Sequence, residues 1–161
     1  IYIFNYKIFD YIPENTFYDF AKNVFPKLLT EPAINTFEVK EYWSDIGTIS
    51  QYIQSMHDLF DEKCFFKHAQ INKQKDGAYI SESSSKIDET VQFKGNSTIG
   101  NNCVIGKNCM IENCIIWDNV EIADGVKLSD CVIASNCVIK ADLCSQIVGA
   151  NEIIETKAVE I

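Results

Sequence analysis

Residues 91–143 decide the fold of this chain, and they read VQFKGNSTIGNNCVIGKNCMIENCIIWDNVEIADGVKLSDCVIASNCVIKADL. A small apolar residue, a serine or a cysteine recurs in this stretch at separations of six or five residues. These small positions are Val91, Ser97, Cys103, Cys109, Cys114, Val120, Val126, Cys131, Cys137 and Leu143. Two residues after each of the first nine comes a large apolar side chain, from Phe93 to Ile139. A spacing of two is the period of a β-strand, so each unit predicts one very short strand.

The residue before each small position predicts a corner. These residues are Thr90, Asn96, Asn102, Asn108, Asn113, Asn119, Gly125, Asp130, Asn136 and Asp142. All except Thr90 are asparagine, aspartate or glycine, which tolerate positive φ and turn a chain sharply. One such unit cannot bury its apolar face alone, so successive turns must stack into a solenoid. The fold class is therefore mainly β, a parallel β-helix of hexapeptide repeats with isoleucine, valine and cysteine inside.

Composition limits the compartment and the partners. The sequence has no apolar run of about 18 residues or more and no secretory signal, so we expect a cytoplasmic protein without a membrane partner. A formal net charge of -9 argues against nucleic acid as the main partner. Five of the seven cysteines occupy small positions of the repeat, and their spacing is not that of metal ligands. We interpret them as reduced thiols that fill a narrow interior.

Strands and helices alternate in the prediction for residues 1–62. Ile1–Phe4 and Ala33–Val39 read as strands, and a helix is expected from Asn15 or Thr16 to Leu29, with a kink at Pro26. Thr48 and Gln51 form a capping box that begins a second helix. The apolar face of that helix carries Ile49, Tyr52, Ile53, Met56 and Phe60.

Polar residues fill the segment 63–78, which we interpret as a linker, and the β-helix domain is expected over residues 79–161. Ile80 and Ile87 are candidates to anchor an irregular first coil. Ile147, Ile153 and Val159 keep a spacing of six after the clear repeat ends, which indicates a degenerate closing coil.

The segments Ile1–Asn5, Asp19–Leu29 and, most specifically, Tyr42–Thr48 (YWSDIGT) resemble the end of the catalytic domain of NDP-sugar pyrophosphorylases. In that family, a left-handed β-helix often follows the catalytic domain. The resemblance implies that the solenoid is left-handed and that residues 1–62 are an α/β remnant of a nucleotidyltransferase domain. It leans towards mannose-1-phosphate guanylyltransferases, with glucose-1-phosphate adenylyltransferases close behind. Such an enzyme joins a nucleoside triphosphate and a sugar 1-phosphate and releases pyrophosphate.

Asp45 is the candidate metal ligand, and Trp43 is a candidate substrate-binding residue. Asp45 falls between a predicted strand and a helix start, where open α/β sheets bind ligands. Magnesium is typically held by one or two carboxylates together with phosphate oxygens. The resemblance implies that Asp45 helps to bind Mg²⁺ in the complete enzyme. Alternatively, Asp45 only brackets the turn before Gly47, and Trp43 belongs to the core.

Other parts of the family's site are absent from this sequence. Its seven glycines form no phosphate-binding cluster, and the family's second metal carboxylate and its sugar-phosphate lysine have no counterpart. The opening Ile1, inside an apolar strand pattern, indicates a piece of a longer protein. We therefore assign no catalytic residue and expect this chain alone to be inactive.

Outward residues of the repeat should stack 17 residues apart, because the two short separations lie three units apart. The three predicted stacks are Thr98, Ile115 and Val132; Val104, Glu121 and Val138; and Met110, Lys127 and Cys144. The first is the most apolar, and Trp117 lies at the corner beyond it. We predict that this face contacts another subunit of a homo-oligomer or the catalytic domain. Ordinary β-branched strand preference is the alternative explanation.

Two other functions fit a hexapeptide solenoid. An acyltransferase would use a histidine near the coils as a general base, but the sequence has only His57 and His68, both before the repeat. Binding of an acyl-CoA would distinguish this class. A non-catalytic subunit or scaffold related to the pyrophosphorylases is the third possibility, and it would lack the Gly-rich nucleotide loop.

Overall fold

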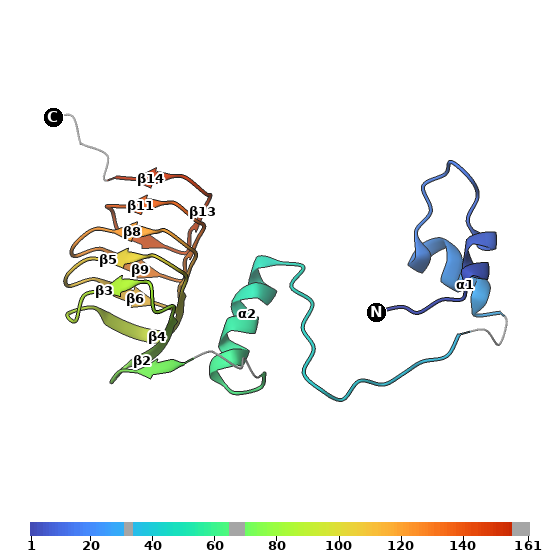
Figure 1. The fold of residues 1–161 in the computed structure, drawn as a ribbon, viewed down its shortest axis with the longest axis horizontal. Coiled ribbons are helices and arrows are strands. Elements are labelled where there is room, and N and C mark those ends of the chain that lie inside the picture. Colours follow the sequence, from blue (N-terminus) through green and yellow to red (C-terminus); the bar gives the residue numbers. More distant parts are fainter. Residues whose placement is uncertain (31–33, 65–69, 156–161) are drawn as a thin grey trace. The chain divides into compact units, whose positions relative to one another are not determined.

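The repeat of residues 91–143 folds into a solenoid of short parallel strands, as predicted (Figure 1). The structure is a computed structural model that describes residues 1–30, 34–64 and 70–155. The chain divides into two units, Ile1–Glu41 and Tyr42–Ile161, and the solenoid belongs to the second.

Fourteen strands occur in the described residues, and all belong to the second unit. They are β1 (Ile71–Lys73), β2 (Gly77–Ser81), β3 (Lys86–Ile87), β4 (Gln92–Ile99), β5 (Val104–Ile105), β6 (Met110–Glu112), β7 (Ile115–Ile116), β8 (Glu121–Ile122), β9 (Lys127–Ser129), β10 (Val132–Ile133), β11 (Val138–Ile139), β12 (Leu143–Cys144), β13 (Ile147–Val148) and β14 (Ile153–Ile154). The repeat units make strands of two to three residues, apart from β4, which continues around a corner.

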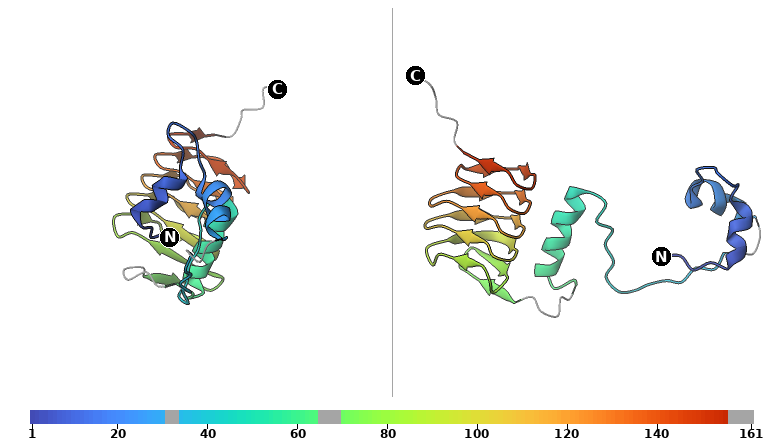
Figure 2. Two further views of the ribbon diagram at one scale, coloured as in Figure 1. Left: turned by 90° about the vertical axis from the view of Figure 1, so that its right-hand side faces the viewer. Right: turned by 45° about the horizontal axis from the view of Figure 1, so that its top comes forward.

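Stacking of these strands gives the solenoid three faces (Figure 2). The first consists of β2, β4, β7, β10 and β13, the second of β3, β5, β8, β11 and β14, and the third of β4, β6, β9 and β12. Thr98 pairs with Ile115 and Ile115 with Val132 on the first face. Val104, Glu121 and Val138 pair in the same way on the second. The first two predicted stacks are therefore confirmed.

The interior is the predicted ladder of small and large side chains. All of the small positions from Val91 to Cys137 are buried, as are all nine of the large positions that follow them. Apart from the polar Ser97, they form one continuous hydrophobic core. The five repeat cysteines, Cys103, Cys109, Cys114, Cys131 and Cys137, therefore lie inside the coils as predicted.

Seven of the ten predicted corner residues have positive φ: Asn102, Asn108, Asn113, Asn119, Gly125, Asp130 and Asn136. At the Asn96 corner, the neighbouring Gly95 has positive φ in place of Asn96. One corner forms a ladder of side-chain hydrogen bonds, in which the amide of Asn102 donates to Asn119, Asn119 to Asn136, and Asn136 to Asn151. Each asparagine of this ladder thus supports both the local turn and the stacking of coils.

The last coil departs from the predicted register. Leu143 pairs with Leu128 and Cys144 with Ser129, so the predicted stack of Cys144 on Lys127 is wrong. Ile139 and Leu143 are four residues apart, whereas Ile122 and Leu128 are six apart, so this corner is two residues shorter. Leu143 consequently occupies a large interior position and packs against the core. Ile147 and Ile153 do form the expected further strands, while Val159 lies outside the described residues.

The solenoid begins earlier than the repeat suggests. Strand β1 and the start of β2 lie within the segment interpreted as a linker, and they pair antiparallel. Strand β2 then pairs parallel with β4 and starts the first face. Tyr79 packs on the core and stacks on Phe93 with ring centroids 4.1 Å apart, whereas Ile80 points outward beside Thr98. An aromatic ring therefore closes this end of the interior, in the role expected of Ile80.

The first unit contains only helical elements in its described residues. They are η1, a 3₁₀ helix (Tyr6–Tyr11), η2, a π-helical turn (Phe20–Val24), and α1 (Phe25–Leu28). The expected helix thus begins at Phe20, after the N-cap Asp19, and Pro26 lies in the first turn of α1, where no backbone donor is needed. The predicted strands at Ile1–Phe4 and 34–39 are wrong, because neither segment has a hydrogen-bonded strand partner here. Ala33 lies outside the described residues.

No helix in the described part of the chain is both long enough and apolar enough to cross a membrane.

Candidate functional site

Helix α2 (Ile49–Phe60) and the segment before it form the candidate site. Thr48 is the N-cap of α2, and its hydroxyl accepts a hydrogen bond from the backbone N–H of Gln51 at 3.2 Å. The Gln51 side chain also accepts a bond from this hydroxyl, at 2.9 Å. The predicted start of the helix is therefore confirmed, and the cap fixes how the chain enters α2.

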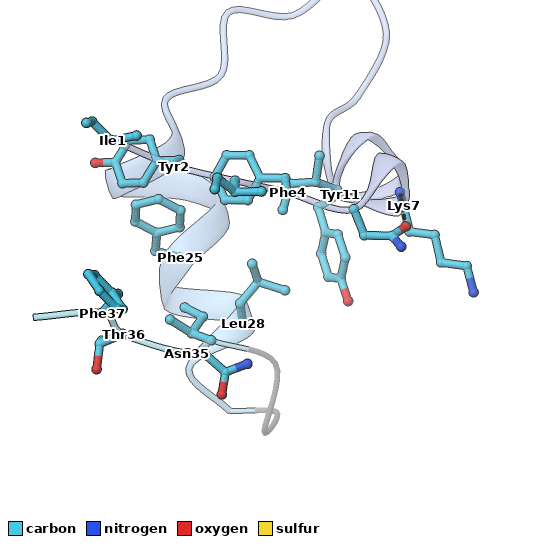
Figure 3. A pocket seen from close by; sticks show the side chains of 14 residues that line it. Ile1, Tyr2, Phe4, Lys7, Tyr11, Phe25, Leu28, Asn35, Thr36 and Phe37 are labelled. Atoms are coloured by element: carbon cyan, nitrogen blue, oxygen red, sulfur yellow. Dashed lines mark hydrogen bonds between the residues drawn. The ribbon is translucent and has the colours of Figure 1, made fainter.

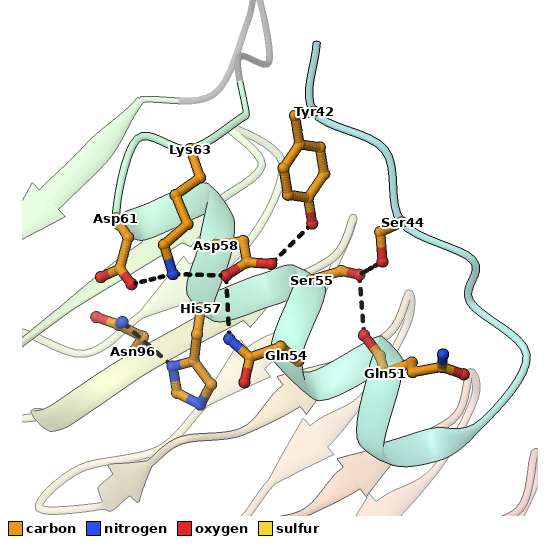
Figure 4. Close-up of polar contacts among 10 residues, drawn as sticks. All are labelled: Tyr42, Ser44, Gln51, Gln54, Ser55, His57, Asp58, Asp61, Lys63 and Asn96. Carbon is orange, nitrogen blue, oxygen red and sulfur yellow. Dashed lines mark hydrogen bonds and ion pairs between the residues drawn. The ribbon is translucent and has the colours of Figure 1, made fainter. Parts of the chain in front are cut away.

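Residues 42–47 run as an extended segment, and the side chains of Tyr42 and Ser44 are directed towards α2 (Figure 4). The Tyr42 hydroxyl donates to Asp58 Oδ2 at 2.9 Å, and Ser44 Oγ lies 2.8 Å from Ser55 Oγ. Because Ser55 donates its own proton to the Gln51 carbonyl, Ser44 is the donor in the second contact. Tyr42 and Ser44 thus attach the segment to α2.

Asp58 is the centre of the polar contacts on α2 (Figure 4). Lys63 Nζ lies 2.9 Å from Asp58 Oδ1 and 3.1 Å from Asp61 Oδ2, and Gln54 donates a further bond to Asp58. The hydrogen bonds from Lys63, Gln54 and Tyr42 hold the pKa of Asp58 below its ordinary value. Asp58 is therefore ionised at neutral pH and joins the segment to the end of α2.

Trp43 and Asp45 occupy the alternate positions and are exposed, Trp43 at 71%. Trp43 is therefore not a core residue in this chain. No hydrogen bond or ion pair within the described residues engages the Asp45 carboxylate, and the helix cap is Thr48. A Cβ added at Gly47 would lie 3.9 Å from each Asp45 carboxylate oxygen, so the carboxylate lies beside the turn at Gly47. Both candidate residues are thus available to a ligand.

The described residues do not complete a metal site around Asp45. They contain no group of three or more histidine, cysteine, aspartate or glutamate side chains placed to hold a metal ion. One exposed carboxylate is too few ligands for Mg²⁺, which requires six oxygen ligands in near-octahedral geometry. Any metal at Asp45 would need oxygen ligands from substrate phosphates, water or further protein.

Helix α2 covers the most apolar face of the solenoid (Figure 2). Met56 is 5% exposed and packs against Ile115 and Val132, which are buried. Tyr52, Ile53 and Phe60 complete this second cluster. The structure therefore brings the predicted contact residues Ile115 and Val132 together beneath a helix of the same chain, so they are not free to meet another subunit.

Two polar contacts flank this apolar cluster. The Trp117 indole N–H donates to the Tyr52 hydroxyl at 3.1 Å, and Asn96 Nδ2 lies 3.3 Å from His57 Nδ1. His57 is thus engaged at the junction of α2 and the solenoid, and His68 lies outside the described residues. Thr98 pairs with Ile115 at the rim, and Trp117 stays 46% exposed.

Two family models match the chain one after the other. The model described as the EIF2B subunit epsilon LbH (left-handed β-helix) domain matches residues 64–159, which is more than half of the 161 residues, and the nucleotidyl transferase model matches residues 1–62. This chain belongs to the NDP-sugar pyrophosphorylase family. The matches place the Asp45 segment and α2 in the nucleotidyltransferase part of the family's sequence and confirm the left-handed β-helix after it.

Curated relatives of this pyrophosphorylase-family chain carry one name. The glucose-1-phosphate adenylyltransferase of Halalkalibacterium halodurans is 38% identical over 69 residues, which cover 38% of this chain and 18% of the relative. Those of Mycoplasma mobile and Fusobacterium nucleatum are 31% and 33% identical over 60% and 59% of this chain. The matches span 26% and 28% of those two relatives. The chain thus spans only a minor part of the length of the relatives it matches.

A groove of about 790 Å³ lies beside α2 in this pyrophosphorylase-family chain. Tyr52, Ile80 and Trp117 supply apolar walls, and Glu82 and Asp118 supply carboxylates. None of its described lining residues is cationic. A phosphate-bearing ligand would meet two negative charges there, so the groove does not resemble a nucleotide site.

An apolar hollow of about 530 Å³ occurs in the first unit (Figure 3). Tyr2, Phe4, Phe25 and Phe37 line it, and Lys7 is the one charged residue among its described lining residues. Backbone donors and cations usually converge on a nucleotide triphosphate. This hollow therefore suits apolar side chains better than phosphates.

Three of the coil thiols are held in the protonated form. Burial raises the pKa of Cys103 and of Cys109 above the ordinary thiol value. The hydrogen bond with Cys131, followed by burial, raises the pKa of Cys114, and the same bond lowers the pKa of Cys131 to about 6. Cys103, Cys109 and Cys114 therefore stay protonated at neutral pH, and Cys131 has no exposed surface, which fits a structural role.

Sequence reasoning missed the residues that attach the Asp45 segment to α2. Ser55 and Asp58 carry no motif of their own, because serine and aspartate are ordinary on an exposed helix face, and Ser44 lies in the Tyr42–Thr48 motif without a predicted role. The alternation of Tyr42 and Ser44 with Trp43 and Asp45 was the available signal. It predicts two opposite sides of an extended segment, only one of which contacts α2.

Proposed function

We propose that this chain is the C-terminal part of a sugar-1-phosphate nucleotidyltransferase. Such an enzyme transfers a nucleotidyl group from a nucleoside triphosphate to a sugar 1-phosphate, with release of pyrophosphate. The observation that carries the proposal is the attachment of the exposed Asp45 segment to α2, which itself lies on a left-handed β-helix. The order of the two family matches and the relatives' name support it.

Glucose 1-phosphate and ATP are the favoured substrates of the complete enzyme. Three relatives with different matched lengths, from Halalkalibacterium, Mycoplasma and Fusobacterium, are all named glucose-1-phosphate adenylyltransferase. Mannose 1-phosphate and GTP, towards which the sequence resemblance leans, are the second choice. The enzyme is proposed to act in the cytoplasm, where nucleotide sugars are made from both kinds of substrate.

Asp45 is proposed to contribute to a Mg²⁺ site only when further ligands are supplied. A magnesium ion would neutralise and align the phosphates of the bound substrates. Within this chain, Asp45 offers one unengaged carboxylate, and Trp43 offers an exposed ring beside it. We assign no catalytic step to Asp45 or Trp43.

The chain by itself is proposed to be inactive. The exposed apolar side chains of the first unit, including Ile3 at 96% and Phe37 at 90%, support this view, because apolar surface of this kind usually meets more protein. The groove described above has no cationic residue in its described lining, and Lys7 is the one cationic side chain in the described lining of the hollow, which is fewer than a nucleotide usually meets. Substrate binding would then depend on parts of the enzyme other than these 161 residues.

A pyrophosphate-release assay tests this function. The gene product in its full natural length is incubated with Mg²⁺, ATP and glucose 1-phosphate, and GTP with mannose 1-phosphate serves as the comparison. We expect release from the first pair, a large loss in Asp45→Asn, and no release by the 161-residue chain. Absence of release from any nucleotide and sugar pair in the full-length product would overturn the proposal, as would turnover by the chain alone.

A non-catalytic subunit is the second candidate, and one observation favours it. The family model that covers most of the chain is described as a domain of EIF2B subunit epsilon, which is one subunit of a larger protein. In that case the full-length product would assemble with partner subunits and release no pyrophosphate. An acyltransferase is less favoured, because His57 lies on α2 against Asn96 and not within a coil.

Assembly into a homo-oligomer through the β-helix belongs to the same proposal. The face first expected to mediate it is covered by α2, so we assign the contact to the second face. Val104 is 45% exposed there and Ile153 is 65% exposed. Replacing both by lysine should reduce the mass measured by light scattering. An unchanged mass in a folded variant would remove this face from the proposal.

A further inference from the structure

Helix α2 has two sides with different partners. One side contributes Tyr52 and Met56 to the contact with the solenoid. The other binds the Asp45 segment through Ser55 and Asp58 (Figure 4). Closely packed elements move as rigid bodies and do not deform continuously. A helix that is packed on both sides therefore holds its two partners in a fixed relative position.

The division of the chain into units agrees with this arrangement. The nucleotidyl transferase match ends at residue 62, yet the structural unit that contains the solenoid begins at Tyr42. Residues 42–62 therefore match the nucleotidyl transferase family in sequence, but in the structure they pack with the solenoid. Asp45 lies within this overlap.

We propose that the solenoid is the platform that fixes the position of Asp45, with α2 as the connecting element. Tyr42, Ser55 and Asp58 are positioning residues, and so are Trp117 and Tyr52 at the solenoid contact. The relevance of Asp45 to catalysis rests on the proposed function, but the mechanical link itself does not.

Two independent sets of contacts make up this link. Loss of the Tyr42 and Ser55 contacts should release the segment and leave α2 in place. Loss of the Ile115 and Val132 packing should release α2 and the segment together. These two expected results distinguish a segment that is held in place by α2 from a segment that would be ordered without it.

Distances between spin labels measure this link without reference to activity. One label is placed at Asp45→Cys and the other at the native Cys144, which is exposed on the solenoid, in a Cys64→Ser background. The five buried cysteines of the coils are shielded from the reagent. We expect one narrow distance peak by pulsed electron paramagnetic resonance of the 161-residue chain.

Matched variants then separate the two sets of contacts. Tyr42→Phe with Ser55→Ala should abolish the narrow peak, while a label at Ile49→Cys on α2 keeps its narrow distance to Cys144. Trp117→Phe with Met56→Ala should broaden both distances. Val104→Ala, on the second face and away from α2, should change neither. Circular dichroism of each variant shows whether the solenoid is folded.

Two outcomes would overturn the proposal. One is a broad distance from residue 45 in the unsubstituted chain. The other is a narrow distance that survives loss of the Tyr42 and Ser55 contacts or the release of α2. A variant pair that unfolds is replaced by Tyr52→Phe alone, which removes only the acceptor of the Trp117 bond. A failed pyrophosphate assay leaves these distances unaffected, so failure of the function and failure of the link are distinguishable.

Discussion

Positive φ angles at the corners of the solenoid are carried by residue types that tolerate them. Asn102, Asn119 and Asn136 adopt φ of 55°, 58° and 63°, and their side chains also donate and accept along one ladder. An asparagine at such a corner therefore lowers the strain of the turn and satisfies its neighbour in the next coil. Glycine meets the first need without the second.

Gly95 offers a test of corner strain. It has φ +56°, and a Cβ there would collide with the Asn113 side chain of the next coil. Gly95→Ala should lower the free energy of unfolding by about 1–3 kcal/mol, from backbone strain and from displacement of Asn113. Gly125→Ala is the matched control, because Gly125 has φ +77° but nothing within 4 Å of the added carbon. Denaturant unfolding should show the smaller loss for the control, and equal losses would contradict the collision.

Cysteine reactivity tests the interior at the same scale. Burial raises the pKa of Cys103 and Cys109, so little thiolate is present at neutral pH, and the coils also shield the sulfur atoms. Iodoacetamide should modify the exposed Cys144 of the native chain first and the five coil cysteines only after unfolding. Peptide mass spectrometry locates the modified residues. Rapid modification of Cys114 or Cys131 in the native chain would contradict a closed interior.

Helix α2 is the element on which the site depends. Its apolar side buries Met56 against Ile115 and Val132, and its polar side carries Asp58. Isolated helices of about 12 residues are marginal in water, so this one is stabilised chiefly by its contact with the solenoid. The cap at Thr48 adds the precise starting point from which the Asp45 segment extends.

Met56→Ala should therefore be costly. Removal of a buried methionine usually lowers the free energy of unfolding by about 2–5 kcal/mol, through lost burial and a residual cavity. Ile49→Ala, on the same helix at a residue that is 44% exposed, is the control and should cost less than about 1 kcal/mol. Urea unfolding followed by circular dichroism measures both. Equal, small losses would show that α2 does not depend on this packing.

Periodicity predicted the solenoid well, because strand, corner and interior each follow from local sequence. The strict alternation around Cys103, Cys109 and Cys114 leaves one possible inside face. The prediction failed at the corner before Leu143, because two missing residues shift the strand register there without removing the apolar pattern. Strands at Ile1–Phe4 and 34–39 failed for another reason. A strand requires a partner, and partners cannot be identified from local pattern alone.

The candidate site was predictable in its residues but not in its attachments. The motif at Tyr42–Thr48 marked the start of α2, which lies where the sequence indicated, whereas the strand predicted before Asp45 does not form in the described residues. The sequence predicted a contact for the face that carries Ile115 and Val132 but did not decide between another subunit and the catalytic domain, since an apolar sheet face is suited to either. Only the tertiary structure identifies which of these is present.

At the scale of the whole molecule, the nucleotidyl transferase match does not end where the second structural unit begins. The nucleotidyl transferase match ends at residue 62, while the second structural unit begins at Tyr42. A chain cut at the family boundary would separate α2 from the face that it covers.

Two fragments test which boundary governs folding. Residues 42–161 should keep the thermal unfolding midpoint of the solenoid, because α2 still covers Ile115 and Val132. Residues 63–161 should unfold at a temperature lower by roughly 5 °C or more and self-associate through the uncovered face. Circular dichroism and light scattering measure the two effects. Identical behaviour of the fragments would show that the contact with α2 contributes little.

The regular register of Thr98, Ile115 and Val132 also constrains how this protein can change length over evolution. Insertion or loss of one residue within a strand would turn the inner side chains outward, whereas adding or removing a complete rung of 17 residues would rejoin every ladder to an equivalent neighbour. Homologues should therefore differ in solenoid height by whole rungs. Variation of one or two residues should be confined to corners, as the shortened turn before Leu143 already illustrates.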